Sequence, residues 1–352
     1  MTEVLCQLLE THDVQAALIT HLPHVRWACG FTGSRGHLLV KLGGLHLLTD
    51  SRYVEQAERE VSGATLHVQS GTLFEIAKRQ GLLEEVERVV FQPEHLSVHA
   101  FGKWRDAFPE LEWVPVERML TKAAAVKSKE AKAMMEQAQA ITDQVYEEIV
   151  EYIRPGLCEL EVAAEVNYRH LKHGANGMAF DTIVAAGPNS ALPHARPGSR
   201  MLREGDCVIL DFGCVYEGYA SDMTRTVVLG KPPSTMKRVY DTVREAQQAA
   251  VECAAAGVEC RKVDLAARTV IQKEGYGDNF LHSTGHGIGL EVHEWPRIAR
   301  ETQEKLPEGI TITIEPGIYV AGQFGVRIED VVEVEADGCR RLSKVPRELV
   351  QL

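Results

Sequence analysis

The sequence has no C-x-x-C pair, which excludes a zinc ribbon, and its cysteines are too widely scattered over 352 residues to form a small disulfide scaffold. None stands in the sequence context of an activated nucleophile, so we expect these side chains to be reduced and packed. The eight cysteines are Cys6, Cys29, Cys158, Cys207, Cys214, Cys253, Cys260 and Cys339.

Long apolar runs are also missing. No stretch approaches the roughly 20 apolar residues that a membrane-spanning helix needs, so we expect no membrane partner. The first residues, MTEVLCQLLETHD, carry acids where a signal peptide would carry a basic start. We therefore expect a cytoplasmic protein.

Runs of lysine and arginine, which a nucleic-acid-binding surface needs, are absent. Since the formal net charge is also -12, we expect no nucleic-acid partner. The remaining composition, 45% apolar and 25% charged, is that of an ordinary globular protein. A chain of 352 residues exceeds the usual size of one hydrophobic core, which favours two domains.

Two segments of different pattern support this division. Residues 1–120 alternate between short apolar strands and amphipathic helices, which predicts a small α/β domain with a mixed sheet. From Lys122 a long helical stretch follows, and the end of the chain alternates apolar and polar residues as antiparallel strands do. The order of two helices followed by strands occurs twice in this second half. We therefore predict an α+β fold with domains at 1–120 and 121–352.

Two aspartates lie beside apolar, strand-like segments, where acids are uncommon. Asp211 follows the run CVIL, and Asp222 comes eleven residues later, beyond a glycine-containing turn. A hairpin closed by that turn would place the two strands side by side, so both carboxylates could face one cleft. Two unpaired anions there would repel each other and would be costly to desolvate. A divalent cation would remove that cost.

A second pair of acids repeats this arrangement. Glu315 in TITIEPGIYV and Glu329 in GVRIEDVV are expected in mid-strand beside apolar residues, and His286 lies between glycines that leave room for a metal or substrate near the backbone. Four carboxylates carry about four negative charges, which match two divalent ions. Oxygen-rich ligation favours hard metals such as Mn²⁺, with Zn²⁺, Co²⁺ or Fe²⁺ as alternatives.

Five stretches, taken in order, closely resemble the prolidase and aminopeptidase P branch of the pita-bread metallopeptidases, family M24. They are FDTIVAAGPNSALPHARPG, LDFGCVYEGYASDMTRTV, STGHGIGLEVHE, ITIEPGIYV and VRIED, within residues 180–332. GFTGSRG and LLTDSRY look like the N-terminal domain of the same branch. The resemblance implies a C-terminal pita-bread catalytic domain, with antiparallel sheets and covering helices, after a smaller creatinase-like α/β domain.

The resemblance also implies a role for each residue that matches the family pattern. His194 and His293 would be catalytic histidines that bind no metal, and Arg327 and Thr224 would contact the metal-binding carboxylates. No expected ligand is replaced. The metal ligands would be Asp211, Asp222, His286, Glu315 and Glu329.

These roles predict the chemistry of a two-metal hydrolase. The metal pair would lower the pKa of a bridging water toward neutrality. Glu315 would carry a proton from that water to the leaving prolyl nitrogen, and His293 or His194 would stabilise the oxyanion. The predicted reaction is hydrolysis of an Xaa-Pro peptide bond.

Recognition of an Xaa-Pro bond, which has no N–H, needs an apolar surface for the pyrrolidine ring. Phe180, Tyr219 and Ile288 have suitable shapes, and each equally suits a core position. A dipeptide also needs a cation for its carboxylate, and Arg297 resembles the arginine that some prolidases use there. We therefore predict a dipeptidase, with aminopeptidase P activity on longer proline-containing peptides as the alternative.

Specific features disfavour three further alternatives. A creatinase-like hydrolase would lack the five ligands, and a methionine aminopeptidase would not need the N-terminal domain. A non-catalytic pita-bread binding module usually loses ligands and carries long charged extensions. His282, His170 and His173 match no motif and are expected to be structural. GFTGSRG is expected to be a mobile loop, and the resemblance implies a homodimer in which such a loop covers the neighbouring cleft.

Overall fold

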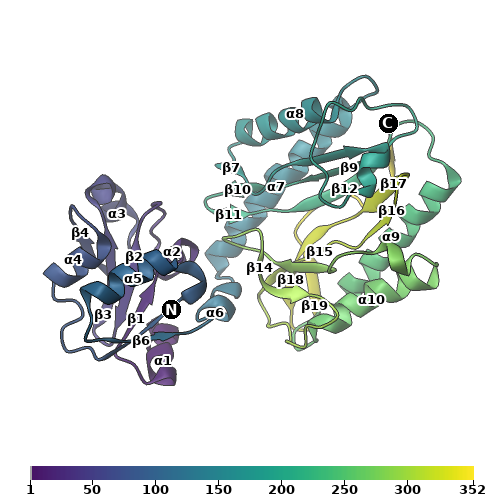
Figure 1. The fold of residues 1–352 in the computed structure, drawn as a ribbon. Helices are drawn as coiled ribbons and strands as arrows, with labels where there is room; N and C mark the ends of the chain where they lie inside the picture. Colours follow the sequence, from purple (N-terminus) through teal and green to yellow (C-terminus); the bar gives the residue numbers. More distant parts are fainter. Residues whose placement is uncertain (1) are drawn as a thin grey trace. The chain divides into compact units, whose positions relative to one another are not determined.

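The structure is a computed structural model that describes residues 2–352. The chain divides into two compact units, Met1–Ala124 and Ala125–Leu352 (Figure 1). This division falls four residues after the boundary expected at residue 120 (124 − 120 = 4). No helix of the described residues is both long and apolar enough to cross a membrane.

The first unit is built around a six-stranded sheet in the order β4-β3-β2-β1-β5-β6. β2 runs antiparallel to both of its neighbours, and the other pairs are parallel. After the turn that follows β2, β3 begins at Gly44, whose φ of 138° suits glycine because it has no Cβ. The strands are β1 (Ala16–Ile19), β2 (His37–Lys41), β3 (Gly44–Thr49), β4 (Ala64–Val68), β5 (Arg88–Phe91) and β6 (Glu112–Pro115).

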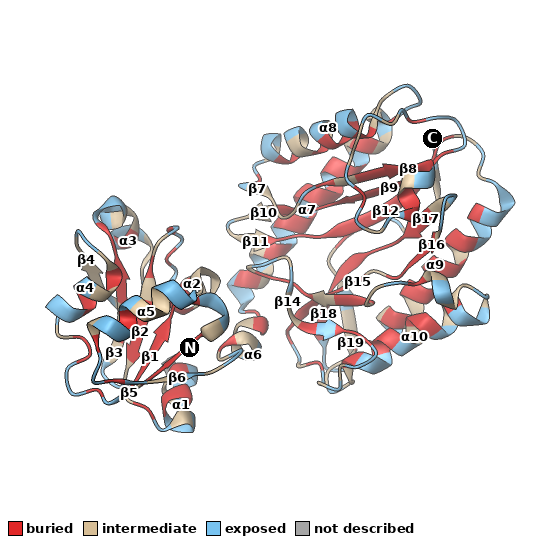
Figure 2. Ribbon diagram, viewed as in Figure 1, coloured by how far each residue is buried: buried red, intermediate tan, exposed pale blue. Residues whose placement is uncertain are grey.

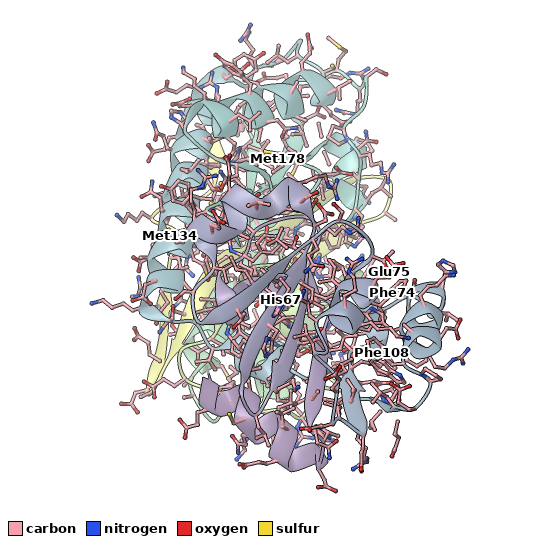
Figure 3. The ribbon with its side chains drawn as sticks, turned by 90° about the vertical axis from the view of Figure 1, so that its left-hand side faces the viewer. His67, Phe74, Glu75, Phe108, Met134 and Met178 are labelled. Atoms are coloured by element: carbon pink, nitrogen blue, oxygen red, sulfur yellow. The ribbon has the colours of Figure 1, made fainter. Side chains whose placement is uncertain are left out.

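Both faces of this sheet are covered, which explains why β1 (AALI) is apolar at every position. One core lies against α1, α2 and α3, and the other against α4 and α5. In the second core Trp104 contacts Phe74 and Phe108, labelled in Figure 3, at ring-centroid distances of 6.3 and 6.0 Å. The helices are α1 (Thr2–His12), α2 (Leu22–Cys29), η1 (Ser51–Tyr53), α3 (Val54–Glu60), α4 (Leu73–Arg79), η2 (Pro93–His95) and α5 (Val98–Ala107).

The GFTGSRG segment follows α2 and is closely packed. Phe31 is 1% exposed, and a Cβ on Gly33 would lie 2.2 Å from its ring. The Thr32 amide donates a hydrogen bond to Glu60 at 2.9 Å. The glycines therefore allow close packing around Phe31, where the sequence suggested only mobility.

The second unit contains two main sheets, each with its own pair of helices (Figure 1). α7 and α8 pack on the sheet β20-β12-β9-β8, and α9 and α10 pack on the sheet β14-β13-β15-β18-β19. The strands are β7 (Gly177–Met178), β8 (Ile183–Ala186), β9 (Cys207–Phe212), β10 (Cys214–Tyr216), β11 (Tyr219–Ala220), β12 (Met223–Val228), β13 (Gly285–Gly287), β14 (Glu294–Ile298), β15 (Thr311–Ile314), β16 (Gly317–Val320), β17 (Phe324–Arg327), β18 (Asp330–Glu335), β19 (Gly338–Arg341) and β20 (Val350–Gln351).

The long helix α7 begins where the Ser128 hydroxyl accepts a hydrogen bond from the Ala131 amide, as an N-cap does. Its buried residues recur every three or four positions, so one face enters the core. The chain leaves the helix before Pro155 and Gly156, whose φ is 95°. The helices are α6 (Thr121–Ala125), α7 (Lys129–Tyr152), α8 (Glu159–Lys172), η3 (Gly187–Ala191), α9 (Ser234–Cys253), α10 (Cys260–Lys273) and η4 (Gly277–Asn279).

The order of helix pair and strands therefore occurs twice in the second unit, first with α7 and α8 and then with α9 and α10. Figure 2 shows that the strands of both main sheets are largely buried. The two sheets carry the candidate ligands, so any site made by these residues draws on both halves of the unit.

Candidate metal centre

Asp211 and Asp222 come from the antiparallel pair of β9 and β12. Asp211 lies in β9 opposite Thr224, and Asp222 directly precedes β12. After β9 the chain passes Gly213, where a Cβ would lie 1.9 Å from the Ser221 carbonyl oxygen. Only glycine allows this approach, and it places both carboxylates in the wall of one cavity.

His286 lies in β13, between Gly285 and Gly287. A Cβ on these glycines would lie 1.9 Å from the Thr313 carbonyl oxygen in β15 and 2.1 Å from the Trp295 carbonyl oxygen in β14. The glycines therefore make room for the neighbouring strands, and not for a metal or substrate as the sequence suggested.

Glu315 and Glu329 lie at breaks between strands, so the expectation of mid-strand positions is wrong. Glu315 follows β15, and its amide donates to the Thr284 carbonyl oxygen at 2.7 Å. Glu329 lies between β17 and β18, and its amide donates to the Thr224 carbonyl oxygen at 3.1 Å. In a strand, successive side chains point to opposite faces of the sheet. A residue at a break does not have to follow this alternation, so both side chains can point into the cavity.

All five predicted ligands line one cavity of about 640 Å³. The His286 Nε2 atom lies 3.6 Å from Glu315 Oε1 and 3.8 Å from Asp222 Oδ2. One ligand atom each from Asp222, His286 and Glu329 lie within 4.8 Å of one another. These separations are short enough for the side chains to share a metal ion.

Two of the carboxylates, those of Asp211 and Glu329, are held by hydrogen bonds to one oxygen, so the other oxygen remains available. Arg327 donates to Asp211 Oδ2 at 2.5 Å and to the Thr224 hydroxyl at 3.1 Å, and that hydroxyl donates to Glu329 Oε2 at 2.7 Å. Asp211 Oδ1, Asp222 Oδ1 and Glu329 Oε1 are buried and have no hydrogen-bond partner within residues 2–352. Buried polar atoms without partners are costly, and cations in the cavity would satisfy all three. The donor set therefore fits a metal centre.

Burial and the charge of neighbouring carboxylates raise the pKa of three of these acids, Asp222, Glu315 and Glu329. Burial, with a contribution from the Asp211 carboxylate, raises the pKa of Glu315 to about 8 against the opposing effect of Arg327. Burial and neighbouring carboxylates also raise the pKa of Asp222 and of Glu329 well above their usual values. Burial lowers the pKa of His286 to about 4, so its imidazole is neutral at pH 7, as a metal ligand must be.

We expect the metal-free protein to lose stability as the pH rises from about 7 to about 8. Glu315, with its folded-state pKa of about 8, keeps a proton that the unfolded chain releases near the usual pKa of about 4.3. The folded state therefore binds more protons in this range, and the free energy of unfolding falls with rising pH. The lowered pKa of His286 acts in the opposite sense, but only below its usual value of 6.5.

Thermal unfolding across this pH range measures the effect, and Mn²⁺ should remove the decline because metal displaces the protons. A melting temperature that rises with pH in the metal-free protein would contradict the prediction.

His194 and His293 line the same cavity, and both side chains are exposed. The rings of His286 and His293 lie 4.4 Å apart between centroids. Partial desolvation in the cavity wall and the nearby His194 lower the pKa of His293, which favours a neutral imidazole with an N–H to donate. The chain beside His293 is fixed by a buried ion pair at 2.5 Å between Lys127 Nζ and Glu294 Oε2.

A chain of hydrogen bonds behind Arg327 was not expected from the sequence. His282 lines the cavity, and its Nδ1 donates to the Ser283 carbonyl oxygen at 2.8 Å. Its Nε2 therefore accepts from the Tyr319 hydroxyl at 2.9 Å, and the Tyr319 oxygen accepts from Arg327 at 2.7 Å. Burial raises the pKa of Tyr319 to about 12, so the hydroxyl keeps its proton. His282 thus has a specific position in the site, where the sequence suggested an ordinary structural residue.

The predicted substrate-contacting residues divide into two groups. Phe180 and Arg297 line the cavity, and the 65% exposed Arg297 side chain pairs with Glu301 at 3.3 Å. Ile288 is 0% exposed in a separate small core, and Tyr219 packs against that core. Neither lines the cavity, so the alternative core position is the one that both residues adopt.

The two other histidines expected to be structural, His170 and His173, are paired outside the cavity, and the cysteines are buried or half-buried. His170 is 0% exposed and contacts Thr142 at 3.3 Å, and His173 pairs with Glu148 at 2.8 Å. Neither histidine lines the cavity. All eight cysteines are free thiols in the structure.

Known proteins match both units of the chain. Residues 133–336 match metallopeptidase family M24, and residues 2–125 match the creatinase/prolidase N-terminal domain. The Xaa-Pro dipeptidase of Pyrococcus furiosus is 37% identical over 313 residues, which cover 88% of this chain and 90% of that protein.

Solved structures match the whole fold. The Xaa-Pro dipeptidase from Bacillus anthracis has a TM-score of 0.96 at 36% identity, covering 100% of this chain and 99% of that one. The X-Pro aminopeptidase from Thermotoga maritima has a TM-score of 0.92, also at 36% identity, covering 98% and 100%. The family and fold predicted from the motifs are therefore confirmed, and M24 metallopeptidases use divalent metals, which agrees with the donor set. The chain belongs to metallopeptidase family M24 and is a metallopeptidase with a creatinase/prolidase N-terminal domain.

Proposed function

We propose that this chain is a dinuclear-metal peptidase that hydrolyses the Xaa-Pro bond of dipeptides. The observation that carries the proposal is the cluster of Asp222, Glu329 and the His286 imidazole, in a cavity whose wall includes three buried carboxylate oxygens without hydrogen-bond partners in the described part of the chain. Two further observations support it. The cavity of about 640 Å³ has the size of a small-ligand site, and Xaa-Pro dipeptidases are among the relatives.

The proposed centre holds two divalent ions. Its four carboxylates carry about four negative charges, and hard oxygen donors favour Mn²⁺, with Zn²⁺, Co²⁺ or Fe²⁺ as alternatives. When bound, the pair supplies an activated water and polarises the scissile carbonyl. The proposed ligands are Asp211, Asp222, His286, Glu315 and Glu329.

Proton transfer falls to the protein's own side chains. A Glu315 carboxylate oxygen would accept the proton of the attacking water and pass it to the prolyl nitrogen, since that nitrogen must be protonated to leave. His293 and His194 flank the same cavity, and a neutral imidazole N–H from either would stabilise the oxyanion of the tetrahedral intermediate. Arg327 and Thr224 would keep the carboxylates in place throughout.

Substrate recognition would use both kinds of side chain in the cavity wall. Phe180, Pro193 and Val292 supply apolar surface for a pyrrolidine ring, which has no N–H to bind. Arg297 would bind the carboxylate of the dipeptide. Its exposed pairing with Glu301 is of the kind that contributes little, so a substrate carboxylate can replace it.

We expect Ala-Pro to be cleaved rapidly by protein reconstituted with Mn²⁺, Ala-Pro amide slowly, and Ala-Ala hardly at all. Arg297→Ala should raise KM for Ala-Pro by about tenfold or more, with a smaller change in kcat, since a charge-assisted bond to the ground state is lost. The same change should leave the amide substrate unaffected. Arg300→Ala is the matched control, since Arg300 is exposed nearby and does not line the cavity.

Rates for Ala-Pro and Ala-Pro-Ala, measured side by side, distinguish the two activities. Faster cleavage of the tripeptide after its first residue would make the protein an aminopeptidase P, the alternative supported by its similarity to the Thermotoga maritima enzyme. No hydrolysis of any proline substrate by metal-loaded protein would overturn the proposal.

We also propose a cytoplasmic homodimer. Free cysteines support a reducing compartment, because secreted proteins tend to form disulfides. The homodimer follows from the family resemblance of the GFTGSRG segment. Light scattering tests it, and a fully active monomer would count against it.

A further inference from the structure

His194 lies in the long loop that connects β8 to β9. The loop leaves β8 at Ala186, passes through the short helix η3, and reaches Gly198 before the chain returns to β9. Two contacts hold its centre against β17: the Gly325 amide donates to the Ser190 hydroxyl at 2.8 Å, and Arg327 donates to the Pro193 carbonyl oxygen at 3.1 Å.

Glu159, the first residue of α8, holds the same loop at three further points. One carboxylate oxygen accepts from the Ala186 amide at 2.8 Å, where the loop begins. The other accepts from the Gly198 amide at 3.2 Å, where the loop ends. Between them the Asn189 side-chain amide donates to both oxygens, at 3.0 and 3.1 Å. All of these donors belong to the loop and its two ends.

The position of Glu159 is unusual for an acid. Its side chain is 0% exposed, and within the described residues no cation lies at ion-pair distance from it. Burying a carboxylate is costly unless hydrogen bonds compensate. Here the compensation comes from the loop donors and from the positive end of the α8 dipole, which favours an acid at the first helical position.

We infer that Glu159 is a positioning residue for catalysis, which fixes the loop 187–198 so that His194 stays at the cavity. The inference rests on the proposed peptidase function for its catalytic part. His194 lies between two anchors: Pro193, held by Arg327 on the metal side, and Gly198, held by Glu159 on the helix side. The Leu160 amide also donates to the Gly198 carbonyl oxygen at 3.0 Å, so the backbone helps to hold this end. The Glu159 carboxylate is the group that ties Gly198 to Asn189 and Ala186.

Glu159→Gln tests the positioning, because the amide keeps the shape of the side chain and replaces an acceptor oxygen by a donor. Glu161→Gln is the matched control, since Glu161 lies in the same helical turn, is exposed, and accepts from the Cys158 amide at 2.7 Å without touching the loop. Hydrogen–deuterium exchange followed by mass spectrometry should show faster exchange of peptides covering 187–198 in metal-free Glu159→Gln, and no change there in Glu161→Gln.

The catalytic part is tested with Mn²⁺-loaded protein. We expect Glu159→Gln to lower kcat for Ala-Pro by about tenfold or more with an unchanged metal content, and to cause no further loss in a His194→Ala background. Such non-additivity identifies residues that act through one another. Equal losses from Glu159→Gln in both backgrounds, or exchange of the loop equal to that of the control, would overturn the inference.

The exchange measurement does not depend on activity, so it remains decisive if wild-type protein cleaves no proline substrate. That result would refute the proposed function and leave the loop anchor standing. If Glu159→Gln does not fold, Asn189→Ala serves instead, because it removes the middle contact and leaves the carboxylate in place. It should give the same exchange pattern, and an unchanged pattern would overturn the inference.

Discussion

Glu315→Gln is expected to abolish hydrolysis and at the same time to stabilise the metal-free protein. The rate should fall by about 10³-fold or more, because the substitution removes both a metal ligand and the proposed proton carrier. The stabilisation arises because the glutamine has no charge to desolvate, whereas burial raises the pKa of Glu315 to about 8. Above the unfolded-state pKa that shift destabilises the folded chain, and the destabilisation grows as the pH rises to about 8.

Both effects are measured on one preparation, by kinetics with Mn²⁺ and by thermal unfolding after metal removal. Glu308→Gln is the control, since Glu308 is exposed and does not line the cavity. It should change neither quantity. A Glu315→Gln protein that keeps a tenth of the wild-type rate, or that unfolds more readily without metal, would contradict the assignment of Glu315 to the centre.

Arg225→Met should destabilise the second unit by about 3–5 kcal/mol, because it leaves the buried Oδ1 atom of Asp330 without a donor, whereas Gln247 and Arg341 contact only Oδ2. The two side chains are 1% and 0% exposed and pair at 2.7 Å. Arg225 also donates to the backbone carbonyl oxygens of Glu329, at 2.6 Å, and Val345, at 3.0 Å. These bonds join β12 to the C-terminal segment beside a proposed metal ligand.

Urea or thermal unfolding of the metal-free protein measures the loss. Arg238→Met is the matched control, because Arg238 pairs with Glu274 at 2.9 Å in a similar geometry but with a 64% exposed side chain. An exposed pair is worth about 0–1 kcal/mol. Equal losses from the two substitutions would show that the buried pair gives no special stability to this region.

The candidate ligands could be predicted because each lies in a short motif whose residues stay together. The hairpin through Gly213 brings Asp211 and Asp222 to one cavity, as the glycine-containing turn suggested. The local backbone was harder to predict. Glu315 and Glu329 lie at strand breaks. The alternation of apolar and polar residues continues across each break, so the sequence does not reveal where the strand ends.

Contacts between distant parts of the chain were beyond sequence reasoning. Tyr319 reaches His282, 37 positions away, and Glu159 reaches Gly198, 39 positions away. The sequence around Tyr319 or around Glu159 does not indicate which distant residue each will contact. Ile288 shows the converse error, because an apolar residue beside His286 in sequence points into a separate core. The sequence motifs therefore indicated the candidate ligand side chains. The fold determined which neighbouring residues hydrogen-bond to them.

The division of the proposed ligands between the two halves of the second unit has a consequence for biosynthesis. Asp211 and Asp222 leave the ribosome well before Glu315 and Glu329, and the bond between Thr224 and Glu329 spans 105 positions. A nascent chain therefore holds one pair of acids without its counterpart until the last strands have emerged. The proposed centre needs ligands from almost the whole chain, so a translation product that stops before Glu329 would lack at least one proposed ligand.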